Sequence, residues 1–274
     1  MTDDDGRIRP VDPGELGIAS PHVEIDTTVA HPARVYDYVL GGKDNYPADR
    51  AVAEQALRIL PSAADETWAN REFLRRAVRY VVRDEGIDQI LDIGTGIPTV
   101  GPTHEVAQSE NPACRVVYVD NDPIVLVHAR ALLAENDSTT VMQADVRDPE
   151  AILAKAKDFL DFSRPIALMF VGLWYFIPED DDPDDLLARY RTALAPGSRL
   201  LLTHALDTPE IREIGKIYKS SAPLVPRSRD RIAELFAGWE LVPPGLTLLQ
   251  EWRPEGGETY CGHMVGGVGR LPAR

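Results

Sequence analysis

The segment DQILDIGTG, from Asp88 to Gly96, constrains the fold more than any other part of this 274-residue chain. Its apolar run from Gln89 to Ile93 predicts a buried β-strand. The strand leads into a turn in which Gly94 and Gly96 lie on either side of Thr95. Glycine has no Cβ, so a ligand can approach the main chain of such a turn closely. The pattern indicates an α/β fold with a ligand at the carboxyl ends of parallel strands.

A second predicted strand, Arg115 to Val119, ends in Asp120, Asn121 and Asp122. The two hydroxyl groups of an adenosine ribose need hydrogen-bond acceptors, and an acidic side chain at a strand end supplies them. We therefore predict that Asp120 and its neighbour Asn121 lie at the ligand.

A third predicted strand, within TTVMQADVRDP, ends at Ala144 and Asp145. We expect Asp145 to accept a hydrogen bond from an adenine amino group and the N–H of Val146 to donate one to the ring. Together with Asp92, the acidic residues at three successive strand ends match the groups of one nucleoside.

The spacing of the glycines favours one class of adenosine cofactor over another. A dinucleotide-binding turn has a third glycine three residues after the second, but Thr99 occupies that position and Pro98 interrupts the turn. S-adenosylmethionine carries an adenosine and no phosphate, so it does not need the missing anion site. Asp92 would repel a pyrophosphate, whereas it could meet the ammonium group of S-adenosylmethionine through water. NAD is the weaker alternative.

Several longer segments resemble class I S-adenosylmethionine-dependent methyltransferases. They are LDIGTGIPTVGPTHEVAQ, CRVVYVDNDPIVLVHARALL and ADVRDP. More narrowly, the chain resembles a bacterial family long described as a domain of unknown function and assigned to the methyltransferases. That family's upstream segments are present as YDYVLGGKDNYPADR and WANREFLRRAVRYV, so the resemblance extends from about Thr28 to the C-terminus. It implies a seven-stranded, mostly parallel Rossmann-like α/β sheet with an N-terminal helical cap.

The composition limits the partners that we expect. The chain has 44 acidic and 29 basic residues and a net charge of -15, which repels nucleic acid and anionic membranes. No apolar stretch reaches the length of a membrane span, and no secretory signal is evident. Cys114 and Cys261 lack metal-ligand spacing and are expected to be buried thiols of a cytoplasmic protein. No metal site is predicted.

The chain divides into three predicted parts: a flexible arm over residues 1–27, a helical cap over 28–86 and the cofactor-binding domain over 87–274. Helices are expected over Ala51 to Ile59, Trp68 to Val82 and His128 to Ala134. Four further strands are expected over Ile166 to Val171, Ser198 to His204, Trp239 to Thr247 and Tyr260 to Val268. The last two are predicted to be antiparallel, because no helix separates them.

The cap contains an unusual polar segment, GGKDNY. We expect it to form a lid in which Gly42 lies against the cofactor and Tyr36 and Tyr46 flank the acceptor. The alternative is a plain surface turn between two helices. Arg71, on the second cap helix, is expected to bind the cofactor's carboxylate, although a surface ion pair is nearly as good an interpretation.

Three side chains are candidates for the base that removes a proton from the acceptor: His204, His31 and Asp44. Trp174 and Tyr175 follow the fourth predicted strand and are expected to form an aromatic wall of the acceptor pocket or to be core. They replace a Leu-His pair that is common in the family. The chain is thus predicted to methylate a small molecule, with oxygen favoured as the acceptor atom. A non-catalytic S-adenosylmethionine-binding regulator and an NAD-dependent dehydrogenase remain alternatives.

Overall fold

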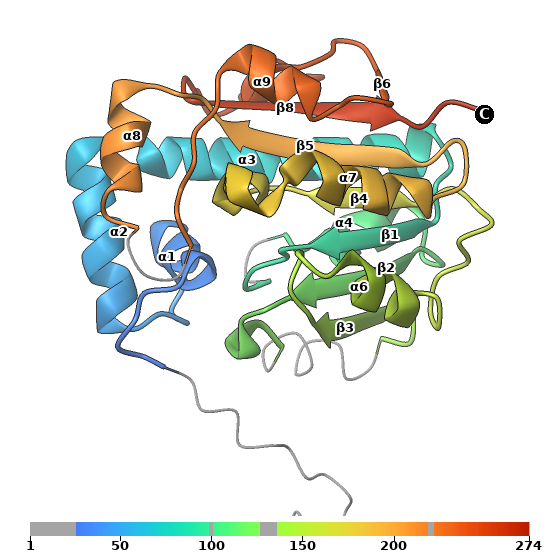
Figure 1. Cartoon of the computed structure of the whole chain (residues 1–274), viewed down its shortest axis with the longest axis horizontal. Coiled ribbons are helices and arrows are strands. Elements are labelled where there is room, and N and C mark those ends of the chain that lie inside the picture. Colours follow the sequence, from blue (N-terminus) through green and yellow to red (C-terminus); the bar gives the residue numbers. More distant parts are fainter. Residues whose placement is uncertain (1–25, 99–100, 127–135, 219–221, 274) are drawn as a thin grey trace, which may run out of the picture.

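A single mixed sheet forms the centre of the molecule. The structure, a computed structural model, describes residues 26–98, 101–126, 136–218 and 222–273. Within these ranges eight strands pair in the order β3-β2-β1-β4-β5-β8-β6, with β7 also paired to β8 (Figure 1). The strands are β1 (Gln89–Ile93), β2 (Arg115–Asp120), β3 (Thr139–Gln143), β4 (Ala167–Phe170), β5 (Arg199–Ala205), β6 (Glu240–Leu241), β7 (Thr247–Leu248) and β8 (Met264–Arg270).

The five strands β1 to β5 are parallel to one another, and β8 is antiparallel to β5, β6 and β7. The predicted α/β fold with a mostly parallel sheet is therefore confirmed, as is the antiparallel pairing near the C-terminus. Because the carboxyl ends of β1, β2 and β4 meet at one edge of the sheet, their terminal residues are brought together there.

The helices are α1 (Pro32–Val39), α2 (Pro47–Ile59), α3 (Ala63–Arg79), α4 (Thr103–Glu110), α6 (Pro149–Ala156), α7 (Pro183–Thr192), α8 (Pro209–Gly215) and α9 (Arg229–Glu234). Five of these, namely α1, α2, α6, α7 and α8, begin with proline. Proline suits that position because its φ is already helical and its missing N–H is not needed in the first turn. A π-helical turn over Tyr80–Asp84 extends α3 toward β1.

Alternate residues of the strands face two separate apolar cores. Ile90 and Val116 pack with α3 and α4 on one face of the sheet. Leu91 and Val117 pack with α6 and α7 on the other. This alternation follows from the two-residue period of a strand. The sheet is thus covered on both faces, and its carboxyl edge is left for other elements.

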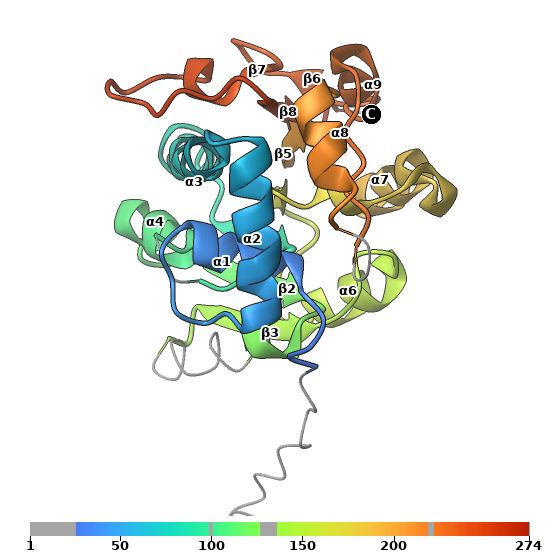
Figure 2. The same ribbon diagram turned by 90° about the vertical axis from the view of Figure 1, so that its left-hand side faces the viewer.

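Helices α1, α2 and α8 gather at that edge, the end toward which β1 and β5 point (Figures 1 and 2). Most of the predicted arm over residues 1–27 and all of the predicted helix His128 to Ala134 lie outside the described residues. The division of the chain at residue 86 into a cap and a cofactor-binding domain remains a prediction.

Two strands differ from their predicted bounds for physical reasons. The predicted strand Trp239 to Thr247 is split into β6 and β7, because Pro243 and Pro244 have no N–H to donate to a ladder. The predicted strand from Tyr260 begins only at Met264. Just before it, the backbone N–H groups of Gly262 and His263 donate to the carboxylate of Glu66 on α3 instead of to a strand.

Cys114 and Cys261 are buried free thiols. Among the described residues, no helix is both long and apolar enough to cross a membrane.

Candidate functional site

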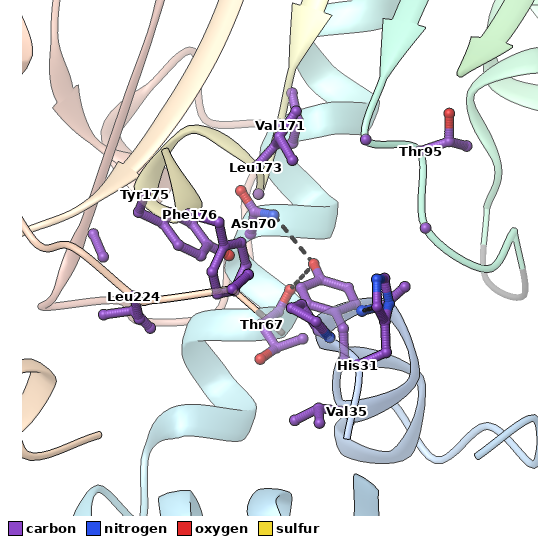
Figure 3. Close-up of a pocket in the computed structure, with 18 of the residues that line it drawn as sticks. His31, Val35, Thr67, Asn70, Thr95, Val171, Leu173, Tyr175, Phe176 and Leu224 are labelled. Atoms are coloured by element: carbon purple, nitrogen blue, oxygen red, sulfur yellow. Dashed lines mark hydrogen bonds between the residues drawn. The ribbon is translucent and has the colours of Figure 1, made fainter. Parts of the chain in front are cut away.

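A continuous cavity runs from the carboxyl ends of β1 and β2 to the space between α2, α3 and α8 (Figure 3). The sequence-predicted residues that line it are Tyr36, Arg71, Asp92, Gly94, Thr95, Gly96, Asp120, Asn121, Val146 and Tyr175. The predicted residues that do not line it are Gly42, Asp44, Tyr46, Asp145, Trp174 and His204. We call the part near the glycine turn the cofactor end and the part between α2 and α8 the far end.

The glycine turn after β1 has the conformation that its sequence requires. Gly94 and Gly96 have φ angles of 73° and 65°, in the left-handed region that glycine adopts without strain. A Cβ on Gly94 would lie 2.7 Å from a methyl carbon of Leu173, which follows β4. The Thr95 hydroxyl donates to the carbonyl oxygen of Asp92 at 3.0 Å, which holds the turn closed.

Asp120, at the end of β2, is buried and lines the cofactor end. Its Oδ2 accepts from the N–H of Gly96 and its Oδ1 from the N–H of Asp122, each at 2.9 Å. Burial raises the pKa of the Asp120 carboxyl, and these two N–H donors oppose that shift. The carboxylate therefore couples the glycine turn to the end of β2, and its remaining lone pairs can accept from ribose hydroxyls.

Asp92 is also buried at the cofactor end. Burial raises the pKa of its carboxyl to about 6, against the opposing effects of the Thr103 hydroxyl, which donates to Oδ2 at 2.7 Å, and of the Arg71 charge. An ionised carboxylate that is costly to bury favours a cationic group beside it. This arrangement suits the ammonium group of an amino acid.

Arg71 on α3 lines the cavity with only 7% of its surface exposed. Its guanidinium carbon lies 5.6 Å from the centre of the Tyr36 ring, a cation–π contact. Its Nε has no hydrogen-bond partner among the described residues, and no ion pair engages the group there. A buried guanidinium with unused N–H groups matches a carboxylate ligand rather than the alternative of a surface ion pair.

Asp145 and Val146 occupy different environments despite being neighbours. The side chain of Asp145 is 44% exposed and pairs with Arg147, whose backbone N–H donates to Asp145 Oδ1 at 2.9 Å. Val146 is buried and lines the cofactor end, while its carbonyl oxygen accepts from the hydroxyl of Tyr190 at 2.9 Å. The geometry thus suits the predicted adenine contact of Val146 better than that of Asp145.

The GGKDNY segment is organised around the buried side chain of Asp37. Asp37 Oδ2 accepts from the backbone N–H of Asp44 and from the Asn45 side chain, both at 2.9 Å. A Cβ on Gly42 would lie 2.0 Å from Asp37 Oδ1, and Gly41, not Gly42, has the positive φ of 82°. Gly42 and Asp44 therefore contribute to a polar turn between α1 and α2 and are not part of the cavity wall.

Tyr46 precedes α2 and packs near Ile97 and Ile124, away from the cavity. The guanidinium of Arg34 lies over its ring at 5.6 Å. Tyr46 thus fastens the cap to the loops that follow β1 and β2. Tyr36, by contrast, lines the cavity: its hydroxyl donates to the carbonyl oxygen of Thr67 at 3.0 Å and accepts from the amide of Asn70 at 3.1 Å.

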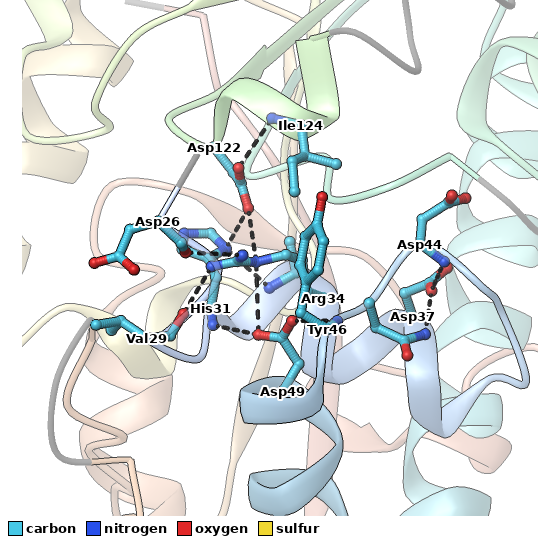
Figure 4. A network of polar contacts seen from close by, with 12 residues as sticks. Asp26, Val29, His31, Arg34, Asp37, Asp44, Tyr46, Asp49, Asp122 and Ile124 are labelled. Carbon is cyan, nitrogen blue, oxygen red and sulfur yellow. Dashed lines mark hydrogen bonds and ion pairs between the residues drawn. The ribbon is translucent and has the colours of Figure 1, made fainter. Parts of the chain in front are cut away.

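A buried network joins the cap to the end of β2 (Figure 4). We call it the cap latch; it consists of His31, Arg34, Asp49 and Asp122. Arg34 Nε lies 3.5 Å from Asp49 Oδ1 and 3.4 Å from Asp122 Oδ2, and His31 Nδ1 lies 3.1 Å from the same Asp122 oxygen. The sequence suggests His31 only as a possible base and gives no sign of this network, since no local pattern links α1 to Asp122.

Trp174 and Tyr175 point to opposite sides of the 3₁₀ turn that follows β4. Trp174 is fully buried in the core beneath α7, with its ring centre 4.5 Å from that of Phe170. Tyr175 lines the cavity. Of the two interpretations offered by the sequence, Trp174 therefore matches core and Tyr175 matches a pocket wall.

His204 lies in β5 and is fully buried. Its Nδ1 lies 2.8 Å from the carbonyl oxygen of Ala205 and its Nε2 lies 2.8 Å from Nη1 of the buried Arg227. Burial lowers the pKa of the imidazole to about 3. With both ring nitrogens engaged and no face on the cavity, His204 is placed to hold Arg227, which also donates to the carbonyl oxygen of Ile177 at 2.7 Å. The position is unsuited to a base.

Comparison with known proteins assigns this chain to a family. Residues 19–272 match a protein family described as S-adenosyl methyltransferase. The chain belongs to this family. A methyltransferase of this family uses S-adenosyl-L-methionine as its cofactor, and the NAD-dependent alternative is set aside.

Solved structures extend the comparison. A protein from Thermobifida fusca YX, provisionally designated a methyltransferase, is 42% identical over 93% of this chain and 100% of that one, with a TM-score of 0.86. A DUF574-family protein from Streptomyces avermitilis MA-4680 is 39% identical over 91% of this chain and 100% of that one, also with a TM-score of 0.86. The magnesium protoporphyrin IX methyltransferase of Synechocystis PCC 6803, with bound S-adenosylhomocysteine, shares the fold. It is 14% identical over 86% of this chain and 92% of that one, with a TM-score of 0.51. No curated protein matches the sequence.

The residues of the cofactor end fit S-adenosylmethionine in charge and hydrogen bonding. The buried Arg71 has an unused N–H for the carboxylate, Asp92 offers a negative charge for the ammonium, and Asp120 offers oxygens for the ribose. Within the described ranges, no group of three His, Cys, Asp or Glu side chains is placed to hold a metal ion.

Proposed function

We propose that this methyltransferase transfers the methyl group of S-adenosylmethionine to a small organic molecule bound at the far end of the cavity. The observation that carries the proposal is the continuity of the cavity: its lining passes from Gly96 and Asp120 to aliphatic side chains of α2 and α8. A pocket between cap helices suits a small molecule. The net charge of -15 also argues against a nucleic acid acceptor.

When bound, S-adenosylmethionine supplies a methyl group on a positively charged sulfur; a lone pair of the acceptor forms the new bond to the methyl carbon while the carbon–sulfur electrons stay on sulfur. In the proposal, Asp120 accepts from the ribose hydroxyls, the N–H of Val146 contacts the adenine, and Arg71 binds the carboxylate. Cap helices α1 and α2 align the two reactants and keep water out.

Tyr36, Tyr46 and Trp174 are among the aromatic residues predicted to lie at the acceptor, and a ring beside the positively charged sulfur would stabilise that charge by cation–π attraction. Tyr36 is the one of these that lines the cavity, and Tyr46 and Trp174 do not. We therefore propose Tyr36 alone for that role. Its ring is already held in place by the hydrogen bonds of its hydroxyl to Thr67 and Asn70.

Oxygen remains our proposed acceptor atom, but without the bases that the sequence suggested. Neither Asp44 nor His204 lines the cavity, and the Nδ1 of His31, which does line it, is already engaged with Asp122 at 3.1 Å. A hydroxyl that must release its proton to water without a dedicated base should be an acidic one. A phenolic hydroxyl, with a pKa near the tyrosine value of about 10, meets this requirement better than an alkyl alcohol.

The proposal is tested by incubating the protein with methyl-labelled S-adenosylmethionine and a bacterial extract divided into small molecules, RNA and protein. We expect label in the small-molecule fraction, on an alkali-stable methyl ether, and much less label with the Asp120→Ala variant at the same cofactor concentration. Label in RNA or protein would contradict the proposal. Binding of S-adenosylmethionine with no transfer to any fraction would instead favour a non-catalytic regulator.

A further inference from the structure

The far end of the cavity is lined mostly by aliphatic side chains. They come from α1, α2 and α8 and from the segment after α8, and include Val39, Ala56, Leu60, Ile211, Ile214 and Leu224. Burying apolar ligand surface against such walls contributes roughly 25 cal/mol per Å². The walls therefore favour an acceptor whose body is apolar.

Charged groups at the far end are few and already engaged. Glu66 lines it, but Glu66 Oε1 accepts from the Gly262 N–H at 3.0 Å and lies 2.8 Å from His263 Nδ1, and Oε2 accepts from the thiol of Cys261 at 2.5 Å. The carboxylate thus anchors the segment before β8 and has little capacity left for a ligand.

The cationic side chains among the described lining residues all lie toward the cofactor end. Arg71 acts electrostatically on Asp92, His31 contacts Asp122, and Arg147 pairs with Asp145. A charged acceptor at the far end would lose its hydration without gaining a counter-ion, which is costly in a buried site. The described part of the pocket therefore favours an uncharged acceptor.

The hydroxyl of Tyr175 is a polar group that remains available at the junction of the two ends. It has no hydrogen-bond partner among the described residues, and it lies 3.6 Å from the position of a Cβ on Gly172. Burial raises the pKa of this hydroxyl, so it stays protonated and can both donate and accept. The Asn70 amide lies on the same side of Gly172, and its Oδ1 is also without a partner there. Figure 3 shows Asn70 between Thr95, at the cofactor end, and Leu224.

Aromatic rings form the wall next to this hydroxyl. The ring centre of Phe176 lies 4.7 Å from that of Tyr175 and 5.7 Å from that of Tyr218. All three residues line the cavity. A flat aromatic ligand can pack edge-on or offset against such a wall, which adds to the stabilisation from burial alone.

We propose that the acceptor is an uncharged, otherwise apolar aromatic compound with a hydroxyl group, which binds with its ring against Phe176 and its hydroxyl at Tyr175. This inference rests on the proposed function, because it takes the far end to be the acceptor site. It adds that the body of the acceptor is uncharged and apolar and that its ring packs against Phe176, and it names Tyr175 as the residue that selects for the hydroxyl.

The test uses protein saturated with S-adenosylhomocysteine and three probes of similar size, measured by calorimetry: 4-butylphenol, 4-butylanisole and 4-butylbenzoate. We expect the phenol to bind about fivefold more tightly than the anisole, the effect of one net hydrogen bond. The benzoate should bind at least about tenfold more weakly than the phenol, because its charge is buried unpaired. Tyr175→Phe should reduce the preference for phenol over anisole to about one, as expected for a lost hydrogen bond.

Two further variants test whether the preference for phenol depends on Tyr175 and whether the probes bind at the far end. Tyr38→Phe removes a tyrosine hydroxyl of α1 that bonds Glu54 outside the cavity, so the preference for phenol should be unchanged. Leu224→Trp should fill the far end and abolish binding of all three probes, while S-adenosylhomocysteine binds as before. Failure of S-adenosylhomocysteine to bind the native protein would contradict the proposed function itself. If it binds but the benzoate is preferred, or no probe binds up to its solubility, or Tyr175→Phe keeps the preference, the acceptor class is wrong.

Discussion

Arg34 on α1 lies 3.4 Å from Asp122, two residues beyond the end of β2, and both side chains are almost fully buried. The contact joins the cap to the loop that follows Asp120. The same guanidinium reaches Asp49 at the start of α2, so one positive charge serves two buried carboxylates. The cap latch therefore holds α1 and α2 across the cofactor end and ties their position to the residues that are proposed to bind ribose.

Arg34→Met should destabilise the protein by about 3 kcal/mol, because it leaves Asp49 and Asp122 buried without their shared cation. Hydrogen exchange over residues 31–46 should become faster, and the affinity for S-adenosylhomocysteine should fall. Chemical denaturation and exchange mass spectrometry measure the two effects. Arg58→Met, at an exposed position on α2, is the matched control and should change neither. Equal stability of the two variants would contradict the role of the latch.

The buried carboxyl of Asp92 should make the cofactor-free protein less stable at neutral pH than an uncharged amide in its place would. The folded-state pKa of about 6 lies above the usual 3.8, so the unfolded state holds fewer protons between these values and stability falls as pH rises through them. The shift corresponds to about 3 kcal/mol above pH 6. Asp92→Asn should therefore raise the free energy of unfolding at pH 7.5, by an amount that shrinks steadily toward pH 4. The variant should also bind S-adenosylmethionine more weakly. A stability gain that is the same at every pH would refute the titration of Asp92.

His204 should remain neutral in the folded protein throughout the physiological range. Its pKa is lowered to about 3 by burial, so the stability that comes from burying the neutral ring is lost as the pH falls from about 6.5 toward 3. Nitrogen-15 NMR of the imidazole should show a single neutral form between pH 5 and pH 8. A titration of His204 near pH 6.5 would restore it as a candidate base.

Gly42→Val should act on stability and not on the site, the reverse of what the sequence suggests for a lid residue. The new Cβ would collide with the Asp37 carboxylate, which holds the turn together. We expect the melting temperature to fall by more than in Gly41→Ala, where the positive φ is strained but the space is open. The affinity for S-adenosylhomocysteine, measured well below the melting temperature, should stay near that of the native protein. A specific loss of affinity would place Gly42 at the cofactor after all.

The cofactor end could be predicted from the sequence because its signals are local. The strand before Gly94, the missing Cβ atoms and the acidic residue at the end of β2 are each read within a few residues. Parallel strands bring their carboxyl ends to one edge, so Asp92 and Asp120 had to be neighbours once the fold class was right.

The other features of the site could not be predicted, because they depend on contacts between distant segments or on the conformation of a turn. The cap latch joins α1 to the loop after β2, and Arg227 reaches His204 and Ile177 from elsewhere in the chain. No periodicity encodes such pairs. Likewise, the 3₁₀ turn after β4 sends Tyr175 into the cavity and its neighbour Trp174 into the core, a choice that the aromatic character of both residues leaves open.

The most direct test of the account is calorimetric titration of S-adenosylhomocysteine into the native protein and into the variants Asp120→Ala and Asp145→Ala. Asp120 lies in the cavity, so its loss should weaken binding by about 1.5 to 3 kcal/mol, the value of charge-assisted hydrogen bonds to the ribose. Asp145 does not line the cavity and pairs with the partly exposed Arg147, so its loss should change the binding free energy by under about 0.5 kcal/mol, as is usual for an exposed pair. Unchanged binding in a folded Asp120→Ala protein, or a larger loss at Asp145 than at Asp120, would contradict the assignment of the cofactor site.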